Sequence, residues 1–450
     1  MSIFKACDVR GVYPHEMDED TARRIGRAVG TILRGKDAVV GGDVRLSTPQ
    51  LKAAVVEGIT SSGCDAADIG IVPTPAFYFA KKKLGAVGGV MVTASHNPPD
   101  HNGLKIILGD LPITEAELSQ IEELAVHGEF ASGAGKQTQV DIIPDYKRFL
   151  TSEFGSRMQA LGRKARVIID CGNGCYSEIA PDVFESLGIP FEPLYCVADG
   201  TFPNRSPNSA DPKNLADLCS AVVRSGADMG IAFDGDGDRV SFVDENGGVL
   251  TADQTIGVIS SQIGVGSGDR VVLDIKCSSA VAQIVESLGA APIMEKSGHT
   301  FIKTRVIREG AKLGGEISGH LFYGELGGGD DGLYSALLMT HIVSEHGPLS
   351  QLAAQVPEYA NTPDLRVGID PDPEVLDTIA AAFPQEAVNR LDGVRVEFGD
   401  GWGLARLSIT EPLITLRFEA KDEQTLKQIM NDFLSPVPNL KEAVRKLREF

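Results

Sequence analysis

The run DAVVGGDVRLSTPQLKAAVVEGITSSGCDAADIGIVPTPAFYFAKKKLGAVGGVMVTA (residues 37–94) alternates short apolar segments with amphipathic ones. The apolar segments have the length of strands and cover 37–43, 64–72 and 87–94. The segments between them, 49–61 and 75–85, have the apolar spacing of helices, and Gly85 is placed to end the second one. Strands and helices that alternate through short connections predict a largely parallel α/β sheet.

The same alternation restarts twice farther along the chain. ARVIIDCGNG (165–174) and DRVVLDIKCS (269–278) each begin a new series of strands and helices. After EYANTPDLRVG (358–368), which has the composition of a linker, the pattern changes to alternating strand-like runs and a final helix from Lys421 onward. We therefore predict three similar α/β domains and a smaller C-terminal α+β domain, covering 1–145, 146–247, 248–357 and 358–450.

Composition narrows the class of protein. The chain has 450 residues, enough for about three or four domains, and a formal net charge of −20. That charge argues against nucleic acid or an anionic membrane as a partner, because both require a basic face. The seven cysteines are scattered, which is typical of free thiols in a reducing compartment. Without a signal-peptide core or an apolar run of about 20 residues, we expect a cytoplasmic protein.

The hexapeptide DGDGDR (234–239) predicts a metal site. Asp234, Asp236 and Asp238 alternate with glycines at the end of an apolar strand. Three carboxylates this close repel one another unless a cation neutralises them, and hard oxygen ligands in that number suit Mg²⁺. An EF-hand loop is disfavoured, because Arg239 occupies its glycine position and a strand-like run follows. The remaining alternative is a solvated acidic turn.

TASHNPPDHNGLKI (93–106) is the second candidate. Ser95 is expected at the exposed end of a strand, where a hydroxyl can act as a nucleophile or carry a phosphate. His96 and Lys105 are proton-handling groups close to it in the sequence. An ordinary polar loop explains this motif equally well when it is taken alone. The G-x-S-x-G pattern of a hydrolase elbow is absent from the sequence.

Two further segments have the groups needed to bind a polyhydroxylated anion. In GEISGH (315–320), Glu316, Ser318 and His320 alternate along a strand end and supply paired donors and acceptors for sugar hydroxyls. In RLSITEP (406–412), a guanidinium and two hydroxyls can clamp a phosphate; these are Arg406, Ser408 and Thr410. RLSITEP and GDGWG (399–403) are predicted as outward loops of the last domain. Polar decoration of a strand end is the alternative for each segment.

In this order, TASHNPPDHNGLK, DGDGDR, GEISGH and RLSITEP resemble the α-D-phosphohexomutase superfamily. The resemblance extends from FKACDVRGVY (4–13) to TLRFEA (415–420). It implies three mixed-sheet α/β domains and a smaller α+β domain around a central cleft, carrying in order the phosphoserine, metal, sugar-binding and phosphate-binding motifs. GEISGH is similar to the GEMSGH of the phosphomannomutase/phosphoglucomutase group, with Ile317 where Met is usual. Cys7, His101 and residues 206–215 depart from the common pattern.

The resemblance also implies a role for each site residue. Ser95 would be the phosphoserine and, through its phosphate, a ligand of Mg²⁺ together with the three aspartates. His96 and Lys105 would transfer protons, and Arg239 and Arg10 would act at the phosphate. The implied substrate-binding residues are Lys276, Gly298, His299, Glu316, Ser318, His320, Arg406, Ser408, Thr410 and Arg417.

The implied activity is the reversible interconversion of hexose 1-phosphate and hexose 6-phosphate, with mannose and also glucose as the sugar. It would proceed through the phosphoserine and a bound hexose 1,6-bisphosphate, with glucose 1,6-bisphosphate or an equivalent as activator. A phosphoglucosamine mutase is the nearest alternative, and a Mg²⁺-dependent sugar phosphatase or a non-catalytic phosphosugar-binding protein are others. The expected partner is a small phosphosugar, and the expected state is a monomer or weak dimer.

Overall fold

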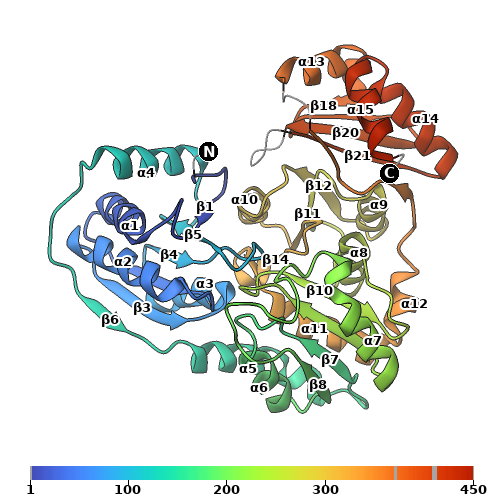
Figure 1. Ribbon diagram of the computed structural model, residues 1–450. Coiled ribbons are helices and arrows are strands. Elements are labelled where there is room, and N and C mark those ends of the chain that lie inside the picture. Colours follow the sequence, from blue (N-terminus) through green and yellow to red (C-terminus); the bar gives the residue numbers. More distant parts are fainter. Residues whose placement is uncertain (1–2, 369–371, 408–412, 449–450) are drawn as a thin grey trace.

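The computed structural model describes residues 3–368, 372–407 and 413–448. Its strands form four separate sheets, each made by one consecutive stretch of chain. The first, blue domain lies to one side of the middle two, and the C-terminal, red domain sits above the third (Figure 1). The predicted fold class, three mixed-sheet α/β units followed by a smaller α+β unit, is confirmed. The domain boundaries remain predictions.

The first sheet has the order β1-β5-β4-β2-β3-β6. Strands β4, β2, β3 and β6 pair in parallel, whereas β5 and β1 are antiparallel additions at one edge. The strands are β1 (Val9–Val12), β2 (Ala38–Gly42), β3 (Ala66–Ile71), β4 (Gly88–Val92), β5 (His101–Ile107) and β6 (Gln137–Gln139). The helices are α1 (Glu19–Leu33), α2 (Thr48–Ser61), α3 (Thr74–Leu84) and α4 (Glu115–His127).

The second and third sheets are also mixed, with orders β10-β9-β7-β8 and β12-β11-β13-β14-β15. The second unit contains α5 (Ile143–Gln159), β7 (Val167–Asp170), α6 (Ile179–Ser186), β8 (Phe191–Leu194), α7 (Ala216–Ser225), β9 (Met229–Phe233) and β10 (Val240–Asp244). The third contains α8 (Ala252–Gln262), β11 (Arg270–Asp274), α9 (Ser279–Ser287), β12 (Ala291–Glu295), α10 (His299–Glu309), β13 (Leu313–Gly315), β14 (Leu321–Tyr323), β15 (Gly329–Asp330), α11 (Gly332–His346) and α12 (Leu349–Ala353). Because β10 is a strand, the EF-hand alternative is wrong.

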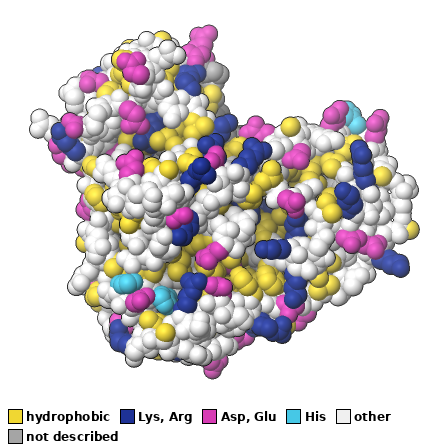
Figure 2. All heavy atoms as spheres, turned by 180° about the vertical axis from the view of Figure 1, so that it is seen from behind, with side chains coloured by type: hydrophobic (Ala, Val, Ile, Leu, Met, Phe, Trp, Pro, Cys, Tyr) yellow, Lys and Arg dark blue, Asp and Glu magenta, His cyan; other side chains and the backbone are white. Residues whose placement is uncertain are grey.

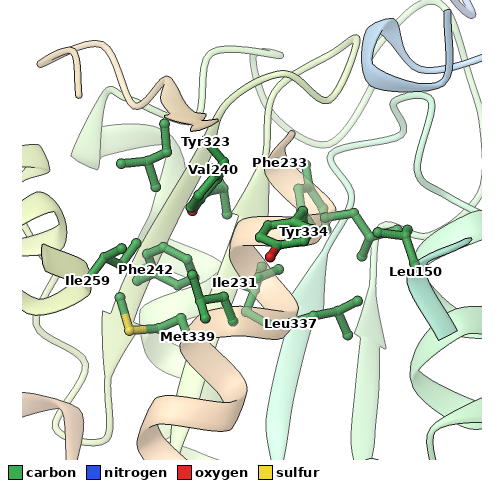
Figure 3. Close-up of a cluster of buried hydrophobic side chains, with 14 of the residues drawn as sticks. Leu150, Ile231, Phe233, Val240, Phe242, Ile259, Tyr323, Tyr334, Leu337 and Met339 are labelled. Carbon is green, nitrogen blue, oxygen red and sulfur yellow. The ribbon is translucent and has the colours of Figure 1, made fainter. Parts of the chain in front are cut away.

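One buried cluster joins the middle two units. Tyr334 and Leu337 of α11 pack against Ile231 and Phe233 of β9, with Leu150 of α5 beside them (Figure 3). The same cluster continues through α3 of the first domain. The metal loop, which follows β9, is therefore anchored on a continuous apolar core.

The C-terminal sheet is antiparallel throughout its described pairs. Its elements are β16 (Ala360–Asn361), β17 (Leu365–Val367), α13 (Pro373–Ala381), β18 (Val388–Asn389), β19 (Val394–Glu397), β20 (Gly401–Leu407), β21 (Ile414–Ala420), α14 (Glu423–Leu434) and α15 (Pro438–Arg448). The prediction of GDGWG as an outward loop is wrong, because β20 begins at Gly401 and Trp402 is fully buried. Trp402 packs against Ile275 of the third unit. The large apolar ring is stable at this position because the third unit shields it from water.

Every helix within the described ranges is too short or too polar to cross a lipid bilayer. The space-filling view shows a deep notch between the C-terminal domain and the first domain, with Lys and Arg side chains around it (Figure 2). Basic side chains at a notch can attract an anion even though the whole chain carries net negative charge.

Candidate active site

Ser95 lies three residues beyond the end of β4, in a strained turn. Its φ is +49°, a left-handed conformation that non-glycine residues rarely adopt, and its N–H donates to Thr93 Oγ1 at 2.8 Å. Strain of this kind persists where surrounding contacts enforce it, often at functional sites. The predicted exposure of Ser95 is wrong: it is 1% exposed, because the metal loop of the second unit covers it.

Arg45, which follows β2, fixes the backbone of this turn through hydrogen bonds. Its guanidinium is fully buried and donates to the backbone carbonyls of the turn, namely those of Ser95, Asn97, Pro98 and His101. Asp43 pairs with Arg45 at 3.1 Å and also accepts a hydrogen bond from Thr93. Sequence reasoning missed Arg45. It could have been found from the predicted parallel sheet: β2 and β4 are parallel neighbours, so the residues that follow their carboxyl ends, Arg45 and Ser95, lie at the same edge.

Asp234, Asp236 and Asp238 converge as the sequence predicted. Each is at most 1% exposed, and one oxygen from each lies within 4.8 Å of the others. Burial, followed by the charges of Asp236 and Asp238, raises the pKa of Asp234 to about 8. Buried carboxylates that repel one another are stabilised by a cation.

Two oxygens of this cluster test whether a metal fits. Asp236 Oδ1 and Asp238 Oδ1 are buried and have no hydrogen-bond partner among the described residues. The other oxygen of Asp236 accepts from Thr74 Oγ1 at 2.6 Å, at the amino end of α3. Buried carboxylate oxygens that lack a hydrogen-bond donor suit a hard divalent cation. The site can therefore bind a metal ion.

The same loop forms a direct bridge to the serine. Ser95 Oγ donates to Asp234 Oδ2 at 2.7 Å, and Asp234 Oδ1 accepts from the backbone of Gly237 and Arg239. Gly235 lies so close that a Cβ atom there would be 2.6 Å from the Ser95 carbonyl oxygen. A phosphate on Ser95 would thus lie against the acidic cluster.

Lys105 projects from β5 into the cluster. Its ammonium donates to Asp236 Oδ2 at 2.8 Å and contacts Asp238. Although burial opposes the charge, Asp236 and Asp238 hold the pKa of Lys105 well above its ordinary value. Lys105 is therefore a protonated donor in this arrangement, rather than a base.

His96 has the opposite character. Its Nδ1 is 3.3 Å from Ser95 Oγ. The positive charge of Arg239, followed by burial, holds the pKa of His96 well below its ordinary value. The imidazole is therefore neutral near pH 7 and can accept the proton of the Ser95 hydroxyl.

The predicted arginines Arg239 and Arg10 both reach this region. Arg239 Nε donates to His320 Nε2 at 3.0 Å, and His320 Nδ1 lies 3.0 Å from Asp330, a residue that sequence reasoning missed. Arg10 donates to the Ala94 carbonyl at 2.9 Å and pairs with Asp8 at 2.8 Å. Two guanidinium groups beside a serine turn can offset phosphate charge.

Several of the predicted sugar-binding residues carry buried polar atoms that have no hydrogen-bond partner among the described residues. Glu316 and Ser318 lie in a tight turn between β13 and β14, so the prediction that they alternate along a strand is wrong. Gly298 has φ +131° and caps α10, which begins with His299. Glu316 Oε2, Ser318 Oγ and His299 Nε2 are buried without a hydrogen-bond partner among the described residues. Buried unpaired groups of this kind require an explanation, and a polar ligand provides one.

The phosphate-binding candidates are partly brought together. Arg417 and Glu316 line the same cavity of about 540 Å³ between the second, third and C-terminal units. Lys276 is connected to Arg417 through Asp364, which lies 3.0 Å from the Lys276 ammonium and 3.8 Å from the Arg417 guanidinium. Arg406 shares a sheet face with Arg417 but pairs with Asp392 at 3.3 Å and does not line this cavity. Ser408 and Thr410 lie outside the described residues.

Known proteins are similar to this chain over most of its length. Sequence models described as Phosphoglucomutase/phosphomannomutase match residues 1–132, 144–248 and 251–359 with alpha/beta/alpha domains I, II and III, and 366–435 with the C-terminal domain. The chain is 38% identical over 444 residues to a phosphomannomutase/phosphoglucomutase of Pseudomonas aeruginosa, covering 96% of this chain and 94% of that protein. It is 35% identical over 454 residues to a phosphoglucomutase of Neisseria meningitidis, covering 97% and 98%.

A crystal structure of a phosphoglucomutase/phosphomannomutase family protein from Burkholderia thailandensis superposes with a TM-score of 0.90 at 35% identity, covering 98% of this chain and 97% of that one. The sequence motifs, the four-unit fold and these matches agree. The chain therefore belongs to the phosphoglucomutase/phosphomannomutase family, within the α-D-phosphohexomutase superfamily.

Proposed function

We propose that this enzyme interconverts hexose 1-phosphate and hexose 6-phosphate, with mannose and glucose as the sugars and Ser95 as the phosphate carrier. The observation that supports this most directly is the 2.7 Å contact between Ser95 Oγ and Asp234, at the edge of three converging carboxylates. The names of the relatives, phosphomannomutase/phosphoglucomutase and phosphoglucomutase, support the choice of sugars. They favour it over the phosphoglucosamine alternative.

The reaction is a pair of phosphoryl transfers. The phosphate on Ser95 passes to the free hydroxyl of a hexose monophosphate, which gives a bound 1,6-bisphosphate and leaves Ser95 as the alcohol. The bisphosphate then presents its other phosphate, and Ser95 Oγ attacks that phosphorus. The bond from phosphorus to the sugar oxygen breaks, the product leaves as the isomeric monophosphate, and the phosphoserine is restored.

The residues around Ser95 can handle the proton in both directions. When Ser95 Oγ attacks, its proton, which points to Asp234 Oδ2 in this structure, can turn to neutral His96, whose Nδ1 lies 3.3 Å away. When Ser95 Oγ is the leaving group, neutral His96 can take the proton of the attacking sugar hydroxyl and pass it to Ser95 Oγ, so that the imidazole is neutral again afterwards. Asp234, Asp236 and Asp238 would hold Mg²⁺, which when bound offsets negative charge on the transferring phosphoryl group. Arg239 and Arg10 would contribute further positive charge.

The sugar and its second phosphate would occupy the remaining candidates. We propose that Glu316 and Ser318, with unpaired buried oxygens, read the sugar hydroxyls, and that His299 assists them. Arg417, with Arg406, Ser408 and Thr410, would bind the phosphate that is not being transferred. Such a site can hold either end of the sugar, because a phosphate is bound in the same way in both orientations. We further propose a cytoplasmic monomer or weak dimer.

The test is a comparison of mannose, glucose and glucosamine 1-phosphates, each with Mg²⁺ and a catalytic amount of glucose 1,6-bisphosphate. We expect the 6-phosphates of mannose and glucose to form faster than that of glucosamine. Release of inorganic phosphate without a hexose 6-phosphate would instead identify a phosphatase and overturn the proposal. In parallel, intact mass after treatment with the bisphosphate should show one added phosphoryl group, which Ser95→Ala should lack. A phosphorylated Ser95→Ala variant would refute the assignment of the carrier.

A further inference from the structure

Cys171 and Cys196 bring two thiols together in the second unit. Their sulfur atoms lie 3.1 Å apart, and both residues are free cysteines. Cys171 directly follows β7 and is fully buried, whereas Cys196 follows β8 and is half-buried. These two strands are parallel neighbours, visible side by side at the lower right of Figure 1. The pair takes no part in the proposed mutase reaction.

The local backbone explains why the thiols meet. Asp170 pairs with Leu194 in the parallel register, so continued alternation would place Cys171 and Cys196 on opposite faces of the sheet. Tyr195, between the strand and Cys196, has φ +54°. This left-handed residue turns the chain and directs Cys196 back toward Cys171. A non-glycine residue in this conformation is uncommon and is maintained by its surroundings.

We propose that Cys171 and Cys196 are a reversible oxidation site, which closes to a disulfide when the enzyme meets a peroxide and slows the mutase reaction. The sulfurs must approach by only about 1 Å to reach a bond length of about 2.05 Å. Cys196 is the sulfur that an oxidant reaches first, because its partner is buried. Hydrogen bonding to Cys171 also lowers the pKa of the Cys196 thiol, while burial raises that of Cys171.

The chemistry balances with hydrogen peroxide as the oxidant. The Cys196 thiolate attacks one peroxide oxygen, the O–O bond breaks, and the departing hydroxide takes up the thiol proton as water. The Cys196 sulfenic acid that remains is attacked by the Cys171 sulfur. The S–S bond forms, the S–O bond breaks, and a second water leaves with the Cys171 proton. Two thiols lose two electrons in total, and the peroxide gains them.

Tight backbone contacts connect this pair to the active site. The turn that begins at Cys171 packs on the metal loop, since Cys175 N–H donates to the Gly235 carbonyl at 3.0 Å. A Cβ atom on Gly174 would be 2.7 Å from that same carbonyl oxygen, so the backbones of the two segments are in close contact. Gly235 in turn abuts the Ser95 carbonyl. A movement of the turn toward Cys196 therefore alters the support of the metal loop. The effect on rate rests on the proposed function, whereas formation of the disulfide does not.

The experiment treats the full-length enzyme with hydrogen peroxide and maps its peptides by mass spectrometry under non-reducing conditions. We expect one cross-linked pair containing Cys171 and Cys196, with the loss of two hydrogen atoms, and its disappearance after dithiothreitol. Cys196→Ser should not form it, whereas Cys219→Ser, which removes another half-buried thiol, should form it normally. Oxidation of Cys196 to sulfinic acid without a cross-link, or cross-linking elsewhere, would overturn the proposal.

Turnover is measured on the same samples. Cross-linked enzyme should lose activity on the order of 10-fold, because small displacements at a phosphoryl-transfer site are costly. Dithiothreitol should restore the rate, and Cys196→Ser should keep its rate through the peroxide treatment. A fully cross-linked enzyme with unaltered turnover would overturn the coupling to the metal loop. Absence of activity in the untreated enzyme would count against the proposed function and leave the peptide result unaffected.

Discussion

Replacing Gly235 with alanine should slow the reaction strongly while the protein remains folded. The added Cβ would be 2.6 Å from the Ser95 carbonyl oxygen, where an ordinary contact begins at 3.4 Å, so the two segments must part by roughly 0.8 Å. The Ser95 carbonyl cannot simply retreat, because Arg45 donates to it at 2.9 Å. A misplacement near 1 Å reduces an aligned reaction about 100-fold. We therefore expect kcat/KM to fall roughly 100-fold, while overpacking lowers the free energy of unfolding by about 1–3 kcal/mol.

The assay is the coupled conversion of glucose 1-phosphate to glucose 6-phosphate, together with single-turnover phosphorylation of Ser95 by glucose 1,6-bisphosphate. Near-UV circular dichroism verifies that the variant is folded. Gly162→Ala is the matched control, since no heavy atom lies within 4 Å of a Cβ there, and its rate should stay within about 2-fold of wild type. A folded Gly235→Ala enzyme with nearly wild-type phosphorylation of Ser95 would refute the argument that these two turns must be in close contact.

Three other predictions concern the Arg45–Asp43 pair, the aspartate cluster and a buried carboxyl of the core. Arg45→Met should lower the free energy of unfolding by about 3–5 kcal/mol in urea titrations, because it leaves Asp43 buried and unpaired, and Arg45→Lys should recover part of the loss; equal stability of all three proteins would contradict the role of the guanidinium. Chelation of divalent cations should abolish turnover but leave the circular dichroism spectrum intact, since the Lys105 ammonium offsets part of the negative charge of Asp236 and Asp238, and Mg²⁺ should restore activity; unfolding on chelation would contradict this. Asp331 is the buried residue that caps the amino end of α11. Burial raises the pKa of Asp331 from its ordinary 3.8 to about 6, so its protonated form stabilises the folded state below pH 3.8 and this contribution is lost as the pH rises through about 6. Asp331→Asn should remove that part of the pH dependence of unfolding, and parallel stability curves for the two proteins would argue against the shift.

The strands and helices that carry the site were largely predictable from the sequence. The strand from Gly88 to Val92 and the helix from Thr74 to Leu84 follow from local apolar spacing and from a glycine at the helix end. The acidic hexapeptide was predictable for a similar reason, because all three carboxylates lie within five residues. Neighbours this close in the chain are forced to interact wherever the loop is placed.

The errors arose where a distant segment determines the environment. Trp402 was expected in an outward loop, but the third domain covers it. Ser95 was expected to be exposed, but the metal loop of the second domain packs over it. Glu316 and Ser318 were expected to converge by alternation along a strand, but a tight turn places them. No periodic pattern within one segment records which other segment will pack against it.

Local sequence patterns were enough to identify the chemical groups of the site and the local elements that present them: the Ser95 turn, the aspartate loop and the alternating strands and helices. Three contacts could be seen only in the folded molecule: Arg45 binds the serine turn, Lys105 enters the aspartate cluster, and Glu316 shares a cavity with Arg417. The physical reason is distance along the chain. Local spacing governs hydrogen bonds and apolar faces within one element, whereas these contacts join residues far apart in sequence and form only when separate sheets pack together.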